Sequence, residues 1–159
     1  MKCSCGAQMV KPFGNMDAKV AVMSDYPAFD DVKNGLAFTG DGGMALRNEL
    51  GKAGIQPESL AMYMLYPHNM RNRDCVEDWE TYAIQMLLGK KLVLLLGKAV
   101  PVFTPYTAEK ITGITTTSPL LKRTTIVCGP SLSTIMSSPI GEMRMACEVF
   151  ADERRKIKC

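Results

Sequence analysis

The chain has 159 residues, of which 47% are hydrophobic and 22% are charged, and its formal net charge is +3. This balance excludes an intrinsically disordered chain, and the small positive charge permits a nucleic-acid partner without requiring one. No apolar run approaches the roughly 20 residues of a membrane-spanning helix, and residues 1–14 contain no apolar core of a secretory signal. We therefore expect a cytoplasmic protein, in a bacterium or a virus-infected host cell, with no membrane partner.

Short apolar runs and amphipathic segments alternate along the chain. The apolar runs predict strands at Ala18–Ser24, Ser59–Leu65, Leu92–Leu96 and Thr124–Cys128. Helical periodicity predicts helices over 42–55, 76–91 and 139–157. The alternation predicts a single domain over 1–159, with a cysteine-containing leader at 1–17. Its expected fold is a three-layer α/β/α sandwich with a central, mostly parallel sheet of about four strands.

Polar and aromatic residues follow the predicted strand ends. Ligands of parallel sheets bind beyond the carboxyl ends of the strands, where the segments 24–31, 66–74 and 129–138 and the turn at 37–43 should converge. The side chains expected there are Asp25, Tyr26, Phe29, Asp30, Asp31, Phe38, Asp41, His68, Asn69, Asn72, Ser131 and Ser133. The sequence therefore predicts a binding site at this edge of the sheet.

The turn "AFTGDGG" at 37–43 has two interpretations. In one, Thr39 or Asp41 caps the following helix by accepting hydrogen bonds from its first N–H groups. In the other, the glycines let the backbone approach a ligand, with Phe38 and Asp41 beside it.

Of the six cysteines, Cys3 and Cys5 form a close pair, whereas Cys75, Cys128, Cys147 and Cys159 are scattered along the chain. Cys128 and Cys147 are expected to be small buried hydrophobic residues. Cys3 and Cys5 form a C-x-C pair in a polar leader, where burial is not the natural explanation, and such a pair favours binding of a metal or cluster.

Three segments resemble the uracil-DNA glycosylase superfamily, nearest its iron–sulfur branches, families four and five. They are "SDYPA" at 24–28 with "NGLAFTGDGG" at 34–43, "LVLLLGKAV" at 92–100, and "VCGPSLSTI" at 127–135. The first is similar to the family's first motif and its glycine-rich turn, and the last falls where the family has its H-P-S loop.

The resemblance implies DNA as partner and an extruded base as ligand. Asp25 matches the family's catalytic acid, with Asp41 as a second candidate. The base-binding candidates are Tyr26, Phe38, which would stack on the base, Tyr63, Asn69 and Asn72. The DNA-binding candidates are Gly42, Gly43, Arg71, Arg73, Pro130, Ser131 and Ser133.

Two functional positions depart from the family pattern. Gly129 stands where the family has the histidine that stabilises the departing base, and Tyr63 stands near its base-reading asparagine. Loss of such a donor costs roughly 100- to 1000-fold in rate.

The resemblance also implies a metal. Cys3, Cys5, His68 and Cys75 are the candidate ligands of a 4Fe–4S cluster or a zinc ion. The alternative is that His68 is a solvated loop residue and Cys75 only begins a helix.

Three functions remain open at this point. The favoured one is a DNA-binding protein with weak or absent uracil excision, serving as a modified-base reader or an accessory of a polymerase or other replication protein. The second is an active DNA glycosylase that removes uracil or a modified pyrimidine. The third is a small-molecule enzyme that binds bases or nucleotides on the same fold.

Overall fold

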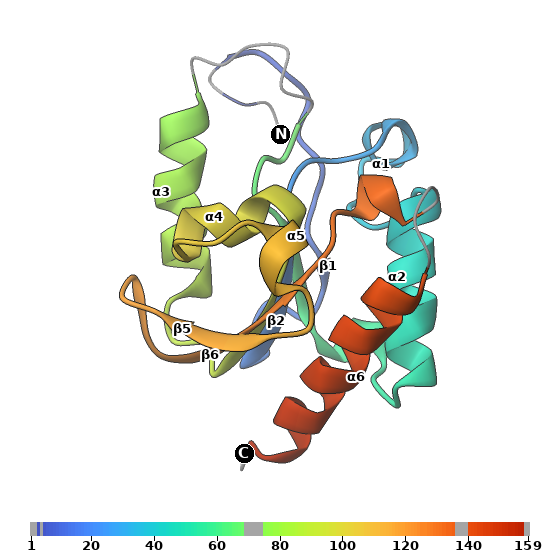
Figure 1. Cartoon of the computed structure of the whole chain (residues 1–159). Coiled ribbons are helices and arrows are strands. Elements are labelled where there is room, and N and C mark those ends of the chain that lie inside the picture. The colour runs from blue at the N-terminus through green and yellow to red at the C-terminus, as the bar shows by residue number, and fades with distance from the viewer. Residues whose placement is uncertain (1–2, 4, 69–74, 136–139, 158–159) are drawn as a thin grey trace.

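The computed structural model describes residues 3, 5–68, 75–135 and 140–157 (Figure 1). Its sheet has six strands in the order β1-β3-β2-β4-β6-β5. The strands are β1 (Phe13–Gly14), β2 (Val20–Ser24), β3 (Ala61–Met64), β4 (Leu92–Leu96), β5 (Thr115–Ser118) and β6 (Leu121–Gly129). The inner four are parallel, and β1 and β5 are antiparallel to their neighbours. The predicted mostly parallel α/β sheet is confirmed, with two strands more than expected.

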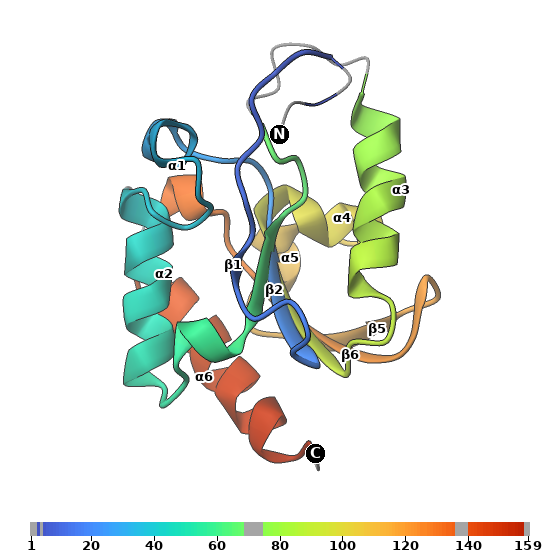
Figure 2. The same ribbon diagram turned by 180° about the vertical axis from the view of Figure 1, so that it is seen from behind.

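Helices cover both faces of the sheet (Figures 1 and 2). One face carries α2 (Asp41–Lys52) and α6 (Gly141–Arg155), and the other carries α3 (Val76–Leu87), α4 (Val100–Phe103) and α5 (Ala108–Ile111). Short elements complete the chain: α1 (Phe29–Asn34) and the 3-10 turns η1 (Pro57–Ser59), η2 (Gly97–Ala99) and η3 (Leu132–Thr134). Within the described ranges, none of the helices has the length and apolar character that a membrane crossing requires.

The central strand β4 shows why the sheet is sandwiched. All five of its residues are buried; Leu92, Leu94 and Leu96 enter the core under α2 and α6, while Val93 and Leu95 enter the core under α3, α4 and α5. A strand that buries both faces needs an uninterrupted apolar run, so its predicted bounds are confirmed. The other predicted strands are present with shifted ends: β2 and β3 are shorter than expected, and β6 begins at Leu121.

The two additional strands carry little apolar signal. β1 has only two residues, and β5 is the sequence TTTS, in which Ser118 alone is buried. Each lies at an edge and pairs with one neighbour, so neither needs the apolar run that marks an inner strand.

A buried carboxylate organises the glycine-rich turn before α2. Asp31 accepts hydrogen bonds from the backbone N–H groups of Ala28 (2.8 Å), Thr39 (2.8 Å) and Gly40 (2.7 Å). The N-cap of α2 is Gly40, with no side-chain cap, and the Thr39 hydroxyl donates to the carbonyl of Leu36. The expectation that Thr39 or Asp41 caps this helix is therefore wrong, because Asp31 reaches the turn from α1.

The glycines of this turn allow close packing within the protein. Phe38 has a φ of +61°, and a Cβ on Gly43 would lie 2.4 Å from the Phe38 Cα. A Cβ on Gly42 would lie 2.7 Å from the carbonyl oxygen of Leu132 in η3. Only glycine at these two positions lets α2 approach the turn and η3 this closely.

We therefore predict that Gly43→Ala destabilises the protein by about 1–3 kcal/mol, because the added methyl group overlaps a backbone atom rather than a movable side chain. The matched control is Gly51→Ala in the same helix, where a Cβ meets no atom within 4 Å. That change should be neutral or stabilising by up to about 1 kcal/mol, because alanine is the better helix former. Urea unfolding of the two variants checks this, and equal effects would contradict it.

Candidate functional site

The carboxylate of Asp25 lies at the carboxyl end of β2 and is only 4% exposed. Its Oδ1 accepts the backbone N–H of Tyr26 (3.0 Å) and the hydroxyl of Ser24 (3.3 Å). Its Oδ2 accepts the hydroxyl of Ser131 (3.0 Å) and the backbone N–H of Lys98 (3.3 Å). One carboxylate thus joins the loops that follow β2, β4 and β6.

These loops meet closely because of a glycine after β4. Gly97 has a φ of +57°, and a Cβ there would lie 2.5 Å from Asp25 Oδ2 and 2.9 Å from the Ser131 Cβ. Beyond Ser131, the hydroxyl of Ser133 lies 2.9 Å from that of Ser131 and is exposed. We call Asp25, Tyr26, Lys98, Ser131 and Ser133 the strand-end site.

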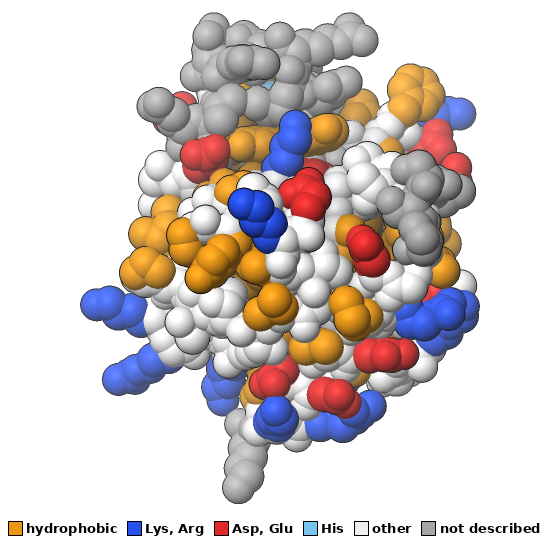
Figure 3. Space-filling view, viewed as in Figure 1, with side chains coloured by type: hydrophobic (Ala, Val, Ile, Leu, Met, Phe, Trp, Pro, Cys, Tyr) orange, Lys and Arg blue, Asp and Glu red, His pale blue; other side chains and the backbone are white. Residues whose placement is uncertain are grey.

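The rim of the strand-end site carries aromatic rings and a cation. The Lys98 Nζ lies 5.2 Å from the centre of the Tyr26 ring, and Tyr26 is 36% exposed. Phe29, three residues further on, is 83% exposed, the highest value among the exposed large hydrophobic residues of the described chain. On the face in Figure 3, basic side chains are interspersed with acidic and hydrophobic ones rather than gathered into one basic surface. The positive charge described at the strand-end site therefore comes from Lys98 and not from an extended basic surface.

Gly129 ends β6 and is buried. A Cβ at this position would point into the core, 2.7 Å from Leu96 Cδ2 and 3.2 Å from the Ala146 Cβ. A side chain at 129 would therefore run beneath α6 and not toward the carboxylate of Asp25.

Several residues that were predicted to bind the base or DNA, or to act in catalysis, are not part of the strand-end site. Phe38 is fully buried in the core under α2 and α6, and Gly43 is buried against it. Tyr63 is 7% exposed and belongs to the opposite core, where burial raises the pKa of its hydroxyl. Asp41 is exposed in the first turn of α2.

The other predicted residues divide in two. Asp25, Tyr26, Ser131 and Ser133 come together, and Pro130 is half-buried beside Ser131. Four predicted residues lie outside the described part of the chain: Asn69, Arg71, Asn72 and Arg73.

A second group of side chains gathers where the leader meets the loop after β3. The ligand atoms of Cys3, Cys5, His68 and Cys75 all lie within 4.8 Å of one another. The His68 Nε2 is 3.5 Å from the Cys5 sulfur and 3.4 Å from the Cys75 sulfur. These four residues, which we call the metal-ligand cluster, could hold a metal ion such as zinc, because three thiols and an imidazole form one of the ligand sets of structural zinc.

The surroundings of the cluster favour a thiolate at Cys3. Burial raises the pKa of this thiol, but hydrogen bonds from the Cys5 backbone N–H, the Trp79 indole and His68 outweigh it and lower the pKa to about 6. Burial, followed by hydrogen bonds with Cys5 and Cys3, raises the pKa of Cys75 to about 11. The indole nitrogen of Trp79 lies 3.3 Å from the Cys3 sulfur, so its N–H can donate to this thiolate and orient it toward a bound metal.

Two contributing residues, Lys98 and Trp79, were missed in the sequence, and a third, Asp31, was expected in a different place. Lys98 lies two residues beyond the end of β4, whose uninterrupted apolar run was predicted as a strand. The rule that ligands bind beyond the carboxyl ends of strands could therefore have identified it. Asp31 was placed at the rim instead of under the turn. Trp79 fits the apolar face of a helix, and no local pattern links it to a cysteine 76 residues away.

The sequence matches no protein-family model and no curated protein.

We predict that the purified protein carries about one metal ion per chain when zinc is supplied, and that Cys75→Ser lowers its zinc affinity at least tenfold by removing one of four ligands. Cys147→Ala is the control, because Cys147 lies on the buried face of α6 and outside the cluster. Competition with a chromophoric chelator measures both. Full affinity in the Cys75 variant would remove this residue from the ligand set.

In the metal-free protein, we predict that one thiol loses its proton near pH 6 and that this step disappears in Cys3→Ser. The lowered pKa means that protons compete with a metal at Cys3 only below about pH 6. Thiolate ultraviolet absorbance across a pH titration checks this. If the first thiol to ionise did so above pH 8, the assignment to Cys3 would be wrong.

Proposed function

We propose that the protein is a DNA-binding relative of the uracil-DNA glycosylases that excises ordinary uracil weakly or not at all. The observation that carries the proposal is the bond between Asp25 and Ser131 across the carboxyl ends of β2 and β6. It brings the carboxylate of "SDYPA" and the serine of "GPSLS" together, as the resemblance of these two segments requires.

Among the described residues, the segment that matches the H-P-S loop offers no charged donor for a leaving base. Hydrolysis of an N-glycosidic bond needs a carboxylate to place water and a donor to meet the negative charge of the departing base. Asp25 supplies the first. The family's histidine corresponds to Gly129, from which any side chain would point toward Leu96 and Ala146. The remaining donors at the H-P-S position are neutral serine hydroxyls, which form weaker bonds than a charged group does.

The rim supports binding of a nucleic acid strand. Exposed aromatic rings stack on bases, and cations contact the backbone phosphates. Tyr26 offers a ring with the Lys98 ammonium next to it, and Phe29 offers a second exposed ring three residues further along the chain. Phe38 is buried, so stacking on it would require a rearrangement, whereas stacking on Phe29 would not.

For the metal-ligand cluster we propose a single zinc ion rather than a 4Fe–4S cluster. A tetrahedral zinc with Zn–S near 2.3 Å and Zn–N near 2.05 Å separates sulfur from nitrogen by about 3.6 Å. The two distances from His68 are 3.5 and 3.4 Å. A four-iron cluster places each ligand on a different iron atom, which requires a wider arrangement than one confined within 4.8 Å.

DNA binding tests the proposal through its salt dependence. We predict that the protein binds DNA with an affinity that falls with salt, and that Lys98→Ala lowers the log–log slope by about 0.9 on duplex DNA, the value of one phosphate contact. Lys122→Ala is the matched control, because Lys122 is an exposed lysine near the start of β6 and Ser131 lies beyond its other end. Fluorescence anisotropy with labelled oligonucleotides measures all three proteins. Equal slopes would move the DNA surface away from the strand-end site, and no binding would end the proposal.

The excision assay decides between the favoured function and an active glycosylase. We predict that uracil release from DNA stays at least 100-fold below that of an ordinary glycosylase, the usual effect of losing one charge-stabilising donor. Asp25→Asn is the control for residual activity, since it keeps the shape of the side chain and removes its charge. Rapid release that Asp25→Asn abolishes would favour the active enzyme, with the Lys98 side chain as the candidate charged donor of the strand-end site. Binding of free nucleosides without DNA binding would favour the small-molecule alternative.

A further inference from the structure

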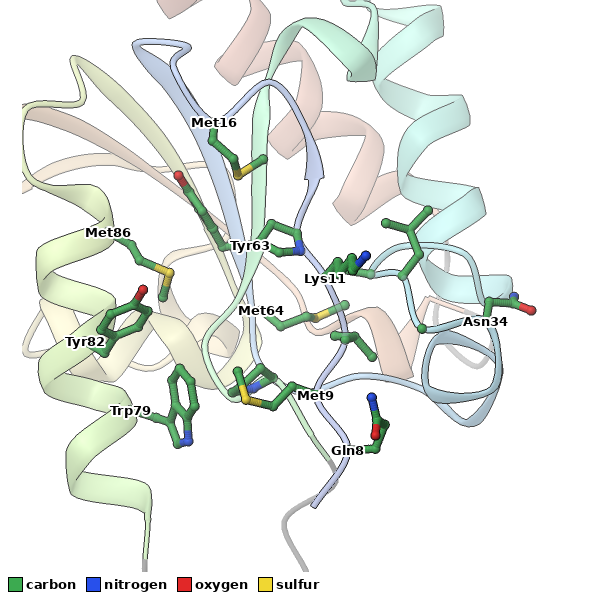
Figure 4. Close-up of a pocket in the computed structure, with 16 residues that line it drawn as sticks. Gln8, Met9, Lys11, Met16, Asn34, Tyr63, Met64, Trp79, Tyr82 and Met86 are labelled. Atoms are coloured by element: carbon green, nitrogen blue, oxygen red, sulfur yellow. The ribbon is translucent and has the colours of Figure 1, made fainter. Parts of the chain in front are cut away.

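A separate cavity of about 730 Å³ lies between the leader and α3. None of the residues of the strand-end site lines it. Three aromatic residues do: Tyr63 from β3 and Trp79 and Tyr82 from α3. In Figure 4, Trp79 and Tyr82 project from α3 toward Met9 of the leader, while Gln8, Lys11 and Asn34 lie at the other side. We call this cavity the leader pocket.

The pocket exists because the leader leaves the edge of the sheet. β1 pairs with β3 only at Phe13 and Gly14. Before that point, Lys11 bridges to Leu36 in the segment between α1 and α2 instead. Pro12 lies between these two pairings and has no N–H to donate to β3. A slot therefore opens between the extended leader and the β3 edge at Tyr63 and Met64.

The volume and lining of the pocket suit a flat organic molecule. Ligand pockets have volumes of roughly 300–1,000 Å³, with mostly apolar walls and a few polar groups that set orientation. Four methionines, Met9, Met16, Met64 and Met86, line the slot together with the three aromatic rings. Methionine sulfur and aromatic faces both pack favourably on a planar ring system. The amides of Gln8 and Asn34 and the ammonium of Lys11 suit a carbonyl or acidic substituent.

Two contacts and one short piece of chain join the leader pocket to the metal-ligand cluster. The Trp79 ring lines the pocket while its N–H donates to the Cys3 sulfur at 3.3 Å. Pro67 lines the pocket, precedes His68, and accepts the backbone N–H of Val10 at 2.8 Å. The piece of chain is the leader wall, residues 8–12, which begins three residues after Cys5. Both ends of this wall are thus fixed, one by the cluster and the other by β1.

We propose that the leader pocket binds a planar aromatic small molecule, and that a metal ion at the metal-ligand cluster holds the pocket in its binding shape. The metal acts by position alone: it fixes the leader wall and orients Trp79, and it does not touch the ligand. This proposal depends on metal binding and not on DNA binding, so the failure of one leaves the other standing.

Methionine-methyl NMR tests the proposal, because four of the twelve methionines line the pocket. Met143, buried in the core under α2 and α6, is the internal control. The probes are naphthalene-2-carboxylate, quinoline and adenine. In the zinc-loaded protein, at least one probe should shift the four pocket resonances in a saturable way and leave Met143 unchanged. If no probe does so, the pocket is not a site for planar aromatic ligands.

Removal of zinc by a chelator tests the holding role. We expect the pocket resonances to broaden or move and saturable probe binding to disappear, while Met143 keeps its position. Unchanged pocket resonances and unchanged probe binding would overturn this role. Loss of the Met143 resonance as well would also overturn it, because the metal would then support the whole fold rather than this wall.

Two variants separate the pocket from the metal. Trp79→Phe keeps an aromatic ring and removes the N–H that meets Cys3, so zinc affinity should fall about 10- to 100-fold. Tyr82 packs edge-on against the Trp79 ring at 5.3 Å but is not one of the four candidate ligands. Tyr82→Ala should therefore lose probe binding at least tenfold, while its zinc affinity changes much less than that of Trp79→Phe. The opposite pattern, or no effect of either variant, would contradict the proposed connection.

Discussion

The buried carboxylate of Asp25 is the interaction on which the strand-end site depends. A charge removed from water must be compensated by hydrogen bonds, and Asp25 obtains them from its own loop, from Lys98 after β4 and from Ser131 after β6. These three loops therefore cannot move independently without leaving the carboxylate short of donors. The same requirement explains Gly97, whose positive φ and missing Cβ allow the loop after β4 to come against Asp25 Oδ2. Asp25 therefore joins the three loops, and under the proposed function the same carboxylate is the group that places a water molecule.

A second buried carboxylate does similar work at the next turn. Asp31 accepts three backbone N–H groups from the start of α1 and the approach to α2, and so fixes the glycine-rich turn without contributing a reactive group. Gly42 and Gly43 then let α2 lie against Leu132 and Phe38. The glycine-rich turn resembles a ligand-binding motif, but Gly42 and Gly43 are already required for close packing within the protein. This does not remove it from a binding site, but it means that glycine at these positions is explained before any ligand is considered.

The inner sheet could be predicted from the sequence because a doubly buried strand has a local signature, as Leu92–Leu96 shows. The edge strand Thr115–Ser118 could not, since its partner β6 supplies its hydrogen bonds and its side chains stay mostly in solvent. The ligand set Cys3, Cys5, His68 and Cys75 was predicted through a resemblance, and the structure brings the four residues together. Phe38 shows the limit of such reasoning. A phenylalanine in a turn fits both a stacking ring and a core ring, and its complete burial depends on a core whose residues come from distant parts of the sequence. Lys98 is the opposite case. Its position beyond a predicted strand could be derived from the sequence, but a lysine at that position indicates no particular function.

The metal-ligand cluster and Asp25 are connected by a short piece of chain. The backbone N–H of Tyr66 donates to the carbonyl of Asp25 at 2.8 Å, and His68 follows two residues later. A metal at the cluster would therefore restrict the movement of the start of the loop after β3. Through the bond between Tyr66 and Asp25, it would also restrict the end of β2. Its role would be structural, because four protein ligands complete a tetrahedral shell and leave no position for water or substrate. The metal would then affect Asp25 only through the position of the backbone that joins them.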